Sequence, residues 1–127
     1  MQRLFTSILT GDVQAAARFY EALLGFERHF DSDWFVILVP PGNPGPELGL
    51  LQRDHAIVPA EAQAAPAGVL LTFVLDDIAG LDIRAEALGG RVVKPSEDMP
   101  YGQRRLLIRD LDGTLVDLSA PLARRPS

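Results

Sequence analysis

The sequence has no cysteine, one tryptophan and only 7% aromatic residues among its 127 positions. Without cysteine the chain can form no disulfide bond, and it offers no thiolate for zinc, for an iron–sulfur cluster or for nucleophilic catalysis. The longest purely apolar run, residues 34–39, is far shorter than the roughly 20 residues that a membrane-spanning helix needs. These absences argue against a protein that is stabilised by disulfide bonds, that depends on a thiol for its chemistry, or that spans a membrane with a helix.

Positive charge is also scarce. Twelve Lys and Arg stand against 17 Asp and Glu, which leaves a formal net charge of −5. Binding to nucleic acid or to an anionic membrane surface needs the opposite sign, so we expect neither partner. The first residues show no signal-peptide pattern. We therefore expect a globular, cytoplasmic protein whose length fits one domain.

Prolines divide the chain. Four of the ten fall in residues 40–46, which must form a loop, and a second Pro-bounded break spans residues 59–66. The break separates module 1, at about 1–58, from module 2, at about 67–122. A shift of 65 positions aligns identical or similar residues of the two modules: Asp12 with Asp77, Val13 with Ile78, Glu21 with Glu86, Ala22 with Ala87, Leu23 with Leu88 and Gly25 with Gly90. This period indicates a duplicated supersecondary unit rather than a solenoid.

Each module contains one predicted helix. Asp12 is a candidate N-cap and Gly25 a candidate stop for the first helix, with an apolar stripe between them at Val13, Ala16, Ala17, Tyr20, Leu23 and Leu24. Asp76 or Asp77 is the candidate cap of the second helix, and Gly89-Gly90 is its stop. The stripe of the second helix is Ile78, Leu81, Ala85 and Leu88.

Short apolar segments around the helices predict strands. They are residues 4–9, 26–30, 34–39 and 48–52 in the first module, and 69–75, 91–94, 104–109 and 114–119 in the second. Asp110-Leu111-Asp112-Gly113 has the turn chemistry of a hairpin between the last two strands. The fold class that follows is α+β, with two βαβββ modules.

Two segments resemble a known family. Gly11-Asp12-Val13, Phe19-Tyr20-Glu21 and Leu24-Gly25-Phe26 are similar to the helix signature of the vicinal oxygen chelate superfamily, which includes glyoxalase I, bleomycin-resistance proteins, extradiol dioxygenases and methylmalonyl-CoA epimerase. The segments 101–105, 109–113 and 116–118 resemble the closing hairpin of the same superfamily. The resemblance implies a cleft built from two βαβββ modules, and a homodimer that often exchanges them.

Metal-dependent relatives hold a divalent ion with one side chain from the first and one from the last strand of each module. Carried over by resemblance, these positions fall on Phe5, Leu70, Asp117 and a residue within 48–51, which our alignment places at Leu50, with Gln52 as an off-register candidate. Only Asp117 is a carboxylate. The resemblance therefore implies that the superfamily's metal site is absent, and we expect no metal and no other cofactor.

Asp117, a neighbouring arginine, Trp34 and Tyr101 are candidates for ligand binding. Asp117 lies on an apolar strand, where Arg104 or Arg105 of the neighbouring strand could pair with it, so it is either a structural ion-pair partner or a ligand-binding or acid–base carboxylate. Trp34 either lines the cleft or packs in the core. Tyr101, between Pro100 and Gly102, is either a ligand lid or a loop anchor.

The two histidines, His29 and His55, stand among polar neighbours and are interpreted as exposed structural residues. The alternative is a displaced metal site built from His29, Glu47, Gln52 or His55. The Arg124-Arg125 pair is interpreted as a solvated tail.

We therefore expect a metal-independent protein that binds a small molecule, similar to the bleomycin-resistance branch, which sequesters a drug or metabolite. The candidate ligand-binding set is Phe5, Trp34, Leu50, Leu70, Tyr101, Arg104 and Asp117. The alternative is a superfamily enzyme, such as a lyase, isomerase or dioxygenase-like protein, that acts on a small oxygenated substrate.

Overall fold

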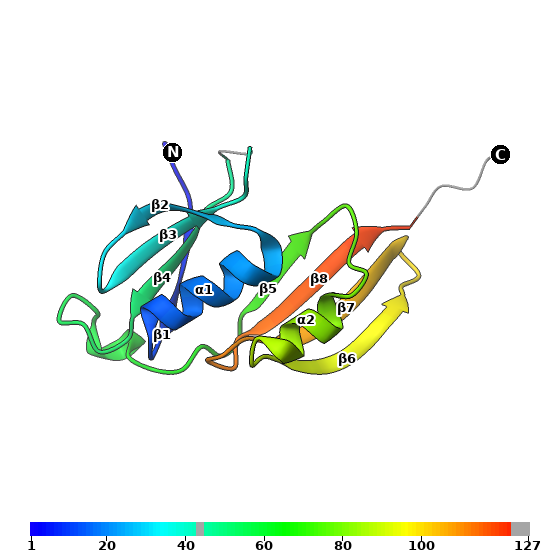
Figure 1. The fold of residues 1–127 in the computed structure, drawn as a ribbon. Coiled ribbons are helices and arrows are strands. Elements are labelled where there is room, and N and C mark those ends of the chain that lie inside the picture. Colours follow the sequence, from blue (N-terminus) through cyan, green and yellow to red (C-terminus); the bar gives the residue numbers. More distant parts are fainter. Residues whose placement is uncertain (43–44, 123–127) are drawn as a thin grey trace. The chain divides into compact units, whose positions relative to one another are not determined.

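The computed structural model describes residues 1–42 and 45–122, so the predicted tail at Arg124-Arg125 lies outside the described residues. The chain divides into two compact units, Met1–Ala67 and Gly68–Ser127. Each unit has the element order β-α-β-β-β, so the predicted α+β fold of two βαβββ modules is confirmed (Figure 1).

The first unit contains β1 (Thr6–Thr10), α1 (Val13–Leu24), β2 (Glu27–Asp31), β3 (Phe35–Val39) and β4 (Leu48–Gln52), followed by the short 3₁₀ helix η1 (Ala60–Ala62). Its four strands form one sheet in the order β1-β4-β3-β2. The first and last strands, β1 and β4, run parallel, and the other pairs are antiparallel. Helix α1 lies on one face of this sheet.

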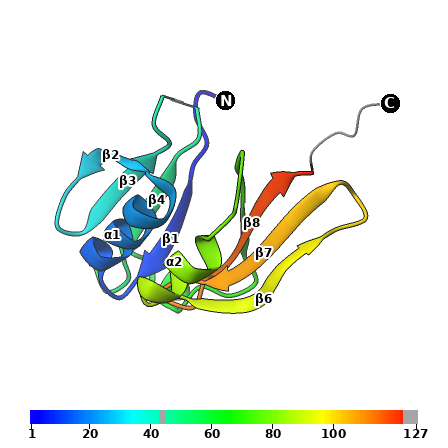
Figure 2. The ribbon, with the colours of Figure 1, turned by 45° about the vertical axis from the view of Figure 1, so that its right-hand side comes forward.

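The second unit repeats this plan with β5 (Leu70–Val74), α2 (Leu81–Ala87), β6 (Arg91–Asp98), β7 (Gln103–Arg109) and β8 (Leu115–Pro121). The strand order is β5-β8-β7-β6, again with the first and last strands parallel. Figure 2 shows α2 on one face of this second sheet. The 65-residue repeat in the sequence thus corresponds to two copies of one topology.

Helix α1 begins and ends where the sequence predicts. The carboxylate of Asp12 accepts a hydrogen bond from the Ala15 N–H at 3.1 Å, which satisfies one of the free donors of the first turn. Gln52 adds a second cap, since its Oε1 accepts from the Val13 N–H at 3.0 Å. Gly25 ends the helix with φ +73°, a left-handed conformation that favours glycine.

The core of the first unit lies between α1 and its sheet. The buried helix residues are Val13, Ala16, Ala17, Phe19, Tyr20 and Leu23. Phe19 was not in the predicted stripe, whereas the predicted Leu24 is only half-buried. The sheet contributes alternate strand residues, as the two-residue period of a strand requires: Ile8, Thr10, Val36, Leu38, Leu48 and Leu50.

Helix α2 is shorter than the sequence predicts. It begins at Leu81, and its N-cap is Gly80, which has φ +77° and no side-chain hydrogen bond. The prediction that Asp76 or Asp77 caps the helix is wrong, because Asp77 Oδ1 accepts instead from the Ala79 N–H at 3.0 Å and closes a turn before the helix. Three of the four predicted stripe residues are buried: Ile78, Leu81 and Ala85.

The closing hairpin forms as predicted. Asp110 Oδ1 accepts hydrogen bonds from the backbone N–H groups of Asp112 and Thr114, at 3.0 and 2.9 Å. Strand β6 is longer than the predicted 91–94 and passes through Pro95, which is tolerated because β6 is an edge strand with irregular pairing. Within the described residues, no helix is long and apolar enough to cross a membrane.

Candidate functional site

Each sheet has a second face, turned away from its helix. Register places Ser7, Gly49 and Ile37 side by side on this face of the first sheet, alternating with the buried residues that contact α1. We call this surface the α1-distal face and its counterpart in the second unit the α2-distal face. The two surfaces carry different chemistry.

The α1-distal face carries a cluster of aromatic rings centred on Phe35. The Phe35 ring centroid lies 6.3 Å from that of Phe5, 5.9 Å from Phe30 and 5.9 Å from Trp34. The Trp34 ring in turn stacks on His55, with centroids 4.1 Å apart and planes 12° apart. We call these five residues the aromatic cluster. Phe5 and Trp34 are among the predicted ligand-binding residues, whereas Phe30, Phe35 and His55 are not.

Phe30 escaped prediction because of a bulge in β2. The pairing with β3 shifts between Arg28 and Phe30, so Arg28 pairs with Leu38 and Phe30 with Ile37. Phe30 therefore shares the α1-distal face, whereas Arg28 stays on the helix side. A regular strand would have placed residues 28 and 30 on the same face.

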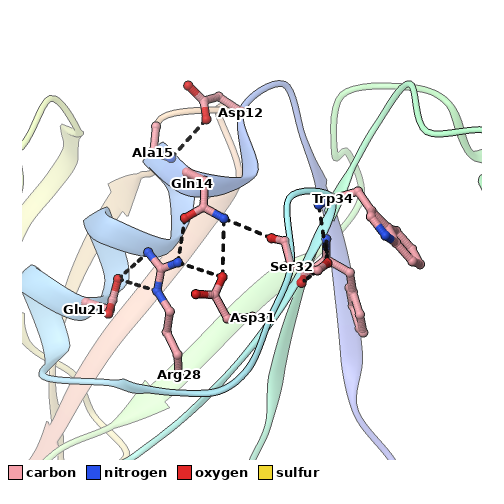
Figure 3. A network of polar contacts seen from close by, with 9 residues as sticks. Asp12, Gln14, Ala15, Glu21, Arg28, Asp31, Ser32 and Trp34 are labelled. Atoms are coloured by element: carbon pink, nitrogen blue, oxygen red, sulfur yellow. Dashed lines mark hydrogen bonds and ion pairs between the residues drawn. The ribbon is translucent and has the colours of Figure 1, made fainter.

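Polar contacts between β2 and α1 hold this bulge in place (Figure 3). Arg28 donates to Glu21 Oε1 from Nε and Nη2, at 3.1 and 2.9 Å, and from Nη1 to Gln14 Oε1 at 2.6 Å. Its Nη1 also lies 3.0 Å from Asp31 Oδ1. The hydrogen bond with Glu21 raises the pKa of Arg28 above its ordinary value. This network holds β2 against the helix. With Arg28 fixed on the helix side, the bulge directs Phe30 to the α1-distal face.

Gly49 makes room for the cluster. A Cβ at this position would lie 2.7 Å from Ser7 Oγ and 3.1 Å from a carbon of the Phe35 ring. The first of these distances is too short for a real contact, so any side chain here would force Ser7 or Phe35 to move. A glycine in a sheet interior often marks such a close approach.

The edges of the cluster carry polar groups. His55 Nδ1 accepts from the Ile57 N–H at 3.2 Å, and His55 is half-buried rather than exposed as predicted. The Arg3 guanidinium lies 4.7 Å from the Phe5 ring centroid and donates two hydrogen bonds to Glu47. The hydrogen bond from Arg3 lowers the pKa of Glu47 below its ordinary value.

The α2-distal face carries a buried carboxylate instead of rings. Asp117, 7% exposed, accepts from Ser119 Oγ at 2.6 Å and more weakly from Thr72 Oγ1 at 3.4 Å. Arg105 Nε lies 3.5 Å from Asp117 Oδ2, which is an ion pair but too long for a good hydrogen bond. Arg105 Nε is buried without a hydrogen-bond partner among the described residues.

The alternative between Arg104 and Arg105 is thereby resolved. Arg105 pairs with Asp117, whereas Arg104 Nε donates to Asp98 Oδ1 at 2.8 Å. Register explains the difference, because Arg105 is directly opposite Ser119 and Arg104 is directly opposite Ala120, on the other face. The structure therefore does not bring the predicted ligand-binding residue Arg104 together with Asp117.

Register also corrects the position that the alignment gave to Leu50. Ser7 and Thr72 are equivalent by the 65-residue repeat; Ser7 is paired with Gly49, and Thr72 with Asp117. The counterpart of Asp117 in the first unit is therefore Gly49. Leu50 is fully buried at 0% exposure in the core beside α1, so it is not on the α1-distal face.

The remaining candidates from the sequence do not belong to the aromatic cluster. Leu70, 46% exposed, shares the α2-distal face, and Tyr101 is 60% exposed in the turn between β6 and β7. Gln52 is committed to capping α1, and Glu47 to its ion pair with Arg3. Within residues 1–42 and 45–122, no three His, Asp or Glu side chains form a group that could hold a metal ion.

A family model described as the Glyoxalase/Bleomycin resistance protein/Dioxygenase superfamily matches residues 4–118. The chain belongs to this superfamily. The match confirms the resemblance found in the sequence. No protein of curated function matches the sequence significantly.

Solved structures of other superfamily members share the fold. A member from Sphaerobacter thermophilus is 28% identical with a TM-score of 0.74, covering 94% of this chain and 97% of its own. A family enzyme from Burkholderia phytofirmans is 20% identical with a TM-score of 0.76, covering 93% and 97%. A lactoylglutathione lyase from Agrobacterium tumefaciens is 22% identical with a TM-score of 0.67, covering 94% of both chains. The last two show likeness of fold alone.

Proposed function

We propose that this superfamily member is a metal-independent binding protein that sequesters a planar small molecule on its α1-distal face. The aromatic cluster is the observation that carries this proposal. Phe35 contacts three rings at once, and the stacked Trp34–His55 pair extends the aromatic surface. Aromatic faces bind flat molecules by stacking, and they bind cations through the ring quadrupole.

Charge supports a neutral or cationic ligand. The chain carries a net charge of −5, which attracts cations and repels anions at long range. Near the cluster, the positive charge of Arg3 is neutralised by Glu47. A planar heteroaromatic cation fits both features.

A thermal-shift screen of planar heteroaromatic compounds tests the proposal, because a ligand that binds only the native state must raise the melting temperature. We expect Trp34→Ala to weaken the binding of a hit about tenfold or more, since stacking on one ring contributes about 1–3 kcal/mol. Trp34→Phe, which keeps a ring, should retain most of the affinity. Equal binding by both variants would contradict the proposal.

Metal independence has its own test. The resemblance assigns metal-ligand positions to Phe5, Leu70, Leu50 and Asp117, and the register replaces Leu50 by Gly49. Only Asp117 is a carboxylate. We expect EDTA to leave both the melting temperature and ligand affinity unchanged, and elemental analysis to find less than stoichiometric Zn, Ni, Mn or Fe. About one such ion per chain would overturn this part of the proposal.

A second candidate function is catalysis by Asp117 on a small oxygenated substrate. The specific observation is a buried carboxylate beside Arg105 and Ser119 on the α2-distal face. Asp117→Asn keeps the shape and removes the charge. A loss of turnover or affinity with an unchanged melting temperature would support this role, whereas a lower melting temperature with intact function would assign Asp117 to structure.

We also propose that the protein is a homodimer. Exposed apolar residues on and beside β5 support association with a second copy: Val69, Leu70 and Val74. Sedimentation at micromolar concentration should give twice the monomer mass, and Val74→Lys should shift it toward the monomer. A monomeric wild type would contradict the proposal.

A further inference from the structure

We propose that the α2-distal face of the β6–β7 hairpin binds a small oxyanion, such as a phosphate group, between Arg91 and Arg109. The two arginines are direct cross-strand partners, so their side chains leave the sheet on the same side. The site shares no residue with the aromatic cluster, so either proposal can fail without the other.

Like charges directly opposite each other destabilise a strand pair. The other two arginines of this hairpin avoid that cost, because each is opposite a carboxylate: Arg104 is paired with Asp98 and Arg105 with Glu97. Only Arg109 has a cation, Arg91, as its partner. An anion placed between the two guanidinium groups would turn the repulsion into two attractive contacts.

A third cation lies on the same face. Lys94 is paired with Leu107, which in turn is paired with Asp117, so Lys94 extends from the α2-distal side. Neither Arg91 nor Lys94 forms an ion pair within the described part of the chain. Arg109 is held in place, since its Nη1 donates to the Gly113 carbonyl at 2.7 Å.

One carboxylate of this face, Asp117, is engaged with the fourth cation, Arg105, and the other, Glu97, is opposite that arginine in the register. Arg91, Lys94 and Arg109 therefore form a local positive patch on a chain whose net charge is −5.

The guanidinium groups of the patch favour a small anion over a long polyanion. Guanidinium groups match the geometry of phosphate and carboxylate oxygens and can donate two parallel hydrogen bonds to them. A long polyanion such as nucleic acid would meet the repulsion of the remaining acidic surface. The ligand class that fits is a small molecule bearing a phosphate or carboxylate group.

The test measures the melting temperature in inorganic phosphate and in chloride at equal ionic strength. We expect phosphate to stabilise the wild type, with a phosphate affinity that falls about fivefold or more in Arg91→Gln, because one of two charge-assisted contacts is lost. Arg84→Gln, which removes an exposed arginine from α2, is the matched control and should respond like the wild type. Succinate in place of phosphate distinguishes a carboxylate from a phosphate as the preferred group.

Arg91→Gln also has a readout without any ligand. In chloride alone it should raise the melting temperature slightly, because it removes the repulsion with Arg109. Trp34→Ala should leave the phosphate response unchanged, which separates this site from the aromatic cluster. The proposal is overturned if phosphate does not stabilise the wild type, or if Arg91→Gln and Arg84→Gln respond to it equally.

Discussion

The two units share one topology and differ in what their helix-distal faces carry. At equivalent places in the register, the first unit has Ser7 beside Gly49 and the second has Thr72 beside Asp117. The glycine leaves space that the Phe35 ring fills, whereas the aspartate forms an ion pair with Arg105. The two faces thus differ at more than one equivalent position, because Gly49 and Phe35 of the first unit correspond to Asp117 and Arg105 of the second.

This difference shows how a duplicated fold can diverge without changing its core. The residues that contact the helices are apolar and buried in both units, including Val36, Leu50, Ile108 and Leu118. Strand alternation isolates these residues from the distal faces. Substitutions on a distal face can therefore alter binding chemistry while the packing against the helix is preserved.

The largest loss of stability should come from giving the first unit the residue that the second unit has at the equivalent position. Gly49→Asp would force Ser7 or Phe35 to move and would bury a carboxylate without an arginine partner, costing about 3 kcal/mol or more. Chemical denaturation measures the loss. The reciprocal Asp117→Gly should cost less, because no ring stands in its way; equal costs would contradict the steric account.

Removing the charge of Arg105 in the second unit should lower stability by a moderate amount. Arg105→Gln leaves Asp117 buried with only its hydroxyl donors, Ser119 and Thr72, and we expect a loss of about 1–2 kcal/mol. In the double variant with Asp117→Asn, the losses should be less than additive, because the two groups interact. Strict additivity would show that the 3.5 Å ion pair contributes nothing to stability.

The smallest change in stability that we expect comes from the Arg3–Glu47 ion pair at the edge of the aromatic cluster, and it depends on pH. Arg3 lowers the pKa of Glu47 in the folded protein from an ordinary 4.5, so this pair stabilises the fold above that value, and the contribution is lost as pH falls through the folded pKa. Glu47→Gln should therefore reduce stability slightly at pH 6, and the reduction should be smaller at pH 3. Melting curves at both pH values check this, and a difference that grows toward pH 3 would contradict the sign.

The sequence predicted the repeat, every strand and the first helix, because these depend on local caps and alternation. It misplaced the start of α2, since Gly80 replaces a side-chain cap that Asp77 offered three residues earlier. It also missed Phe30 and the role of Gly49. Both depend on which strands pair and in what register, including the bulge at His29, and that information lies in contacts between distant segments.

Fluorescence of the only tryptophan, Trp34, tests the central claim most directly, since its ring belongs to the aromatic cluster. A planar compound that raises the melting temperature should change this emission, and the titration should saturate at the concentration that the thermal shift indicates. Phe35→Leu should weaken both signals together, whereas Ile83→Ala, on the exposed side of α2, should leave them unchanged. A stabilising ligand that leaves Trp34 emission unchanged and binds Phe35→Leu with full affinity would contradict the account.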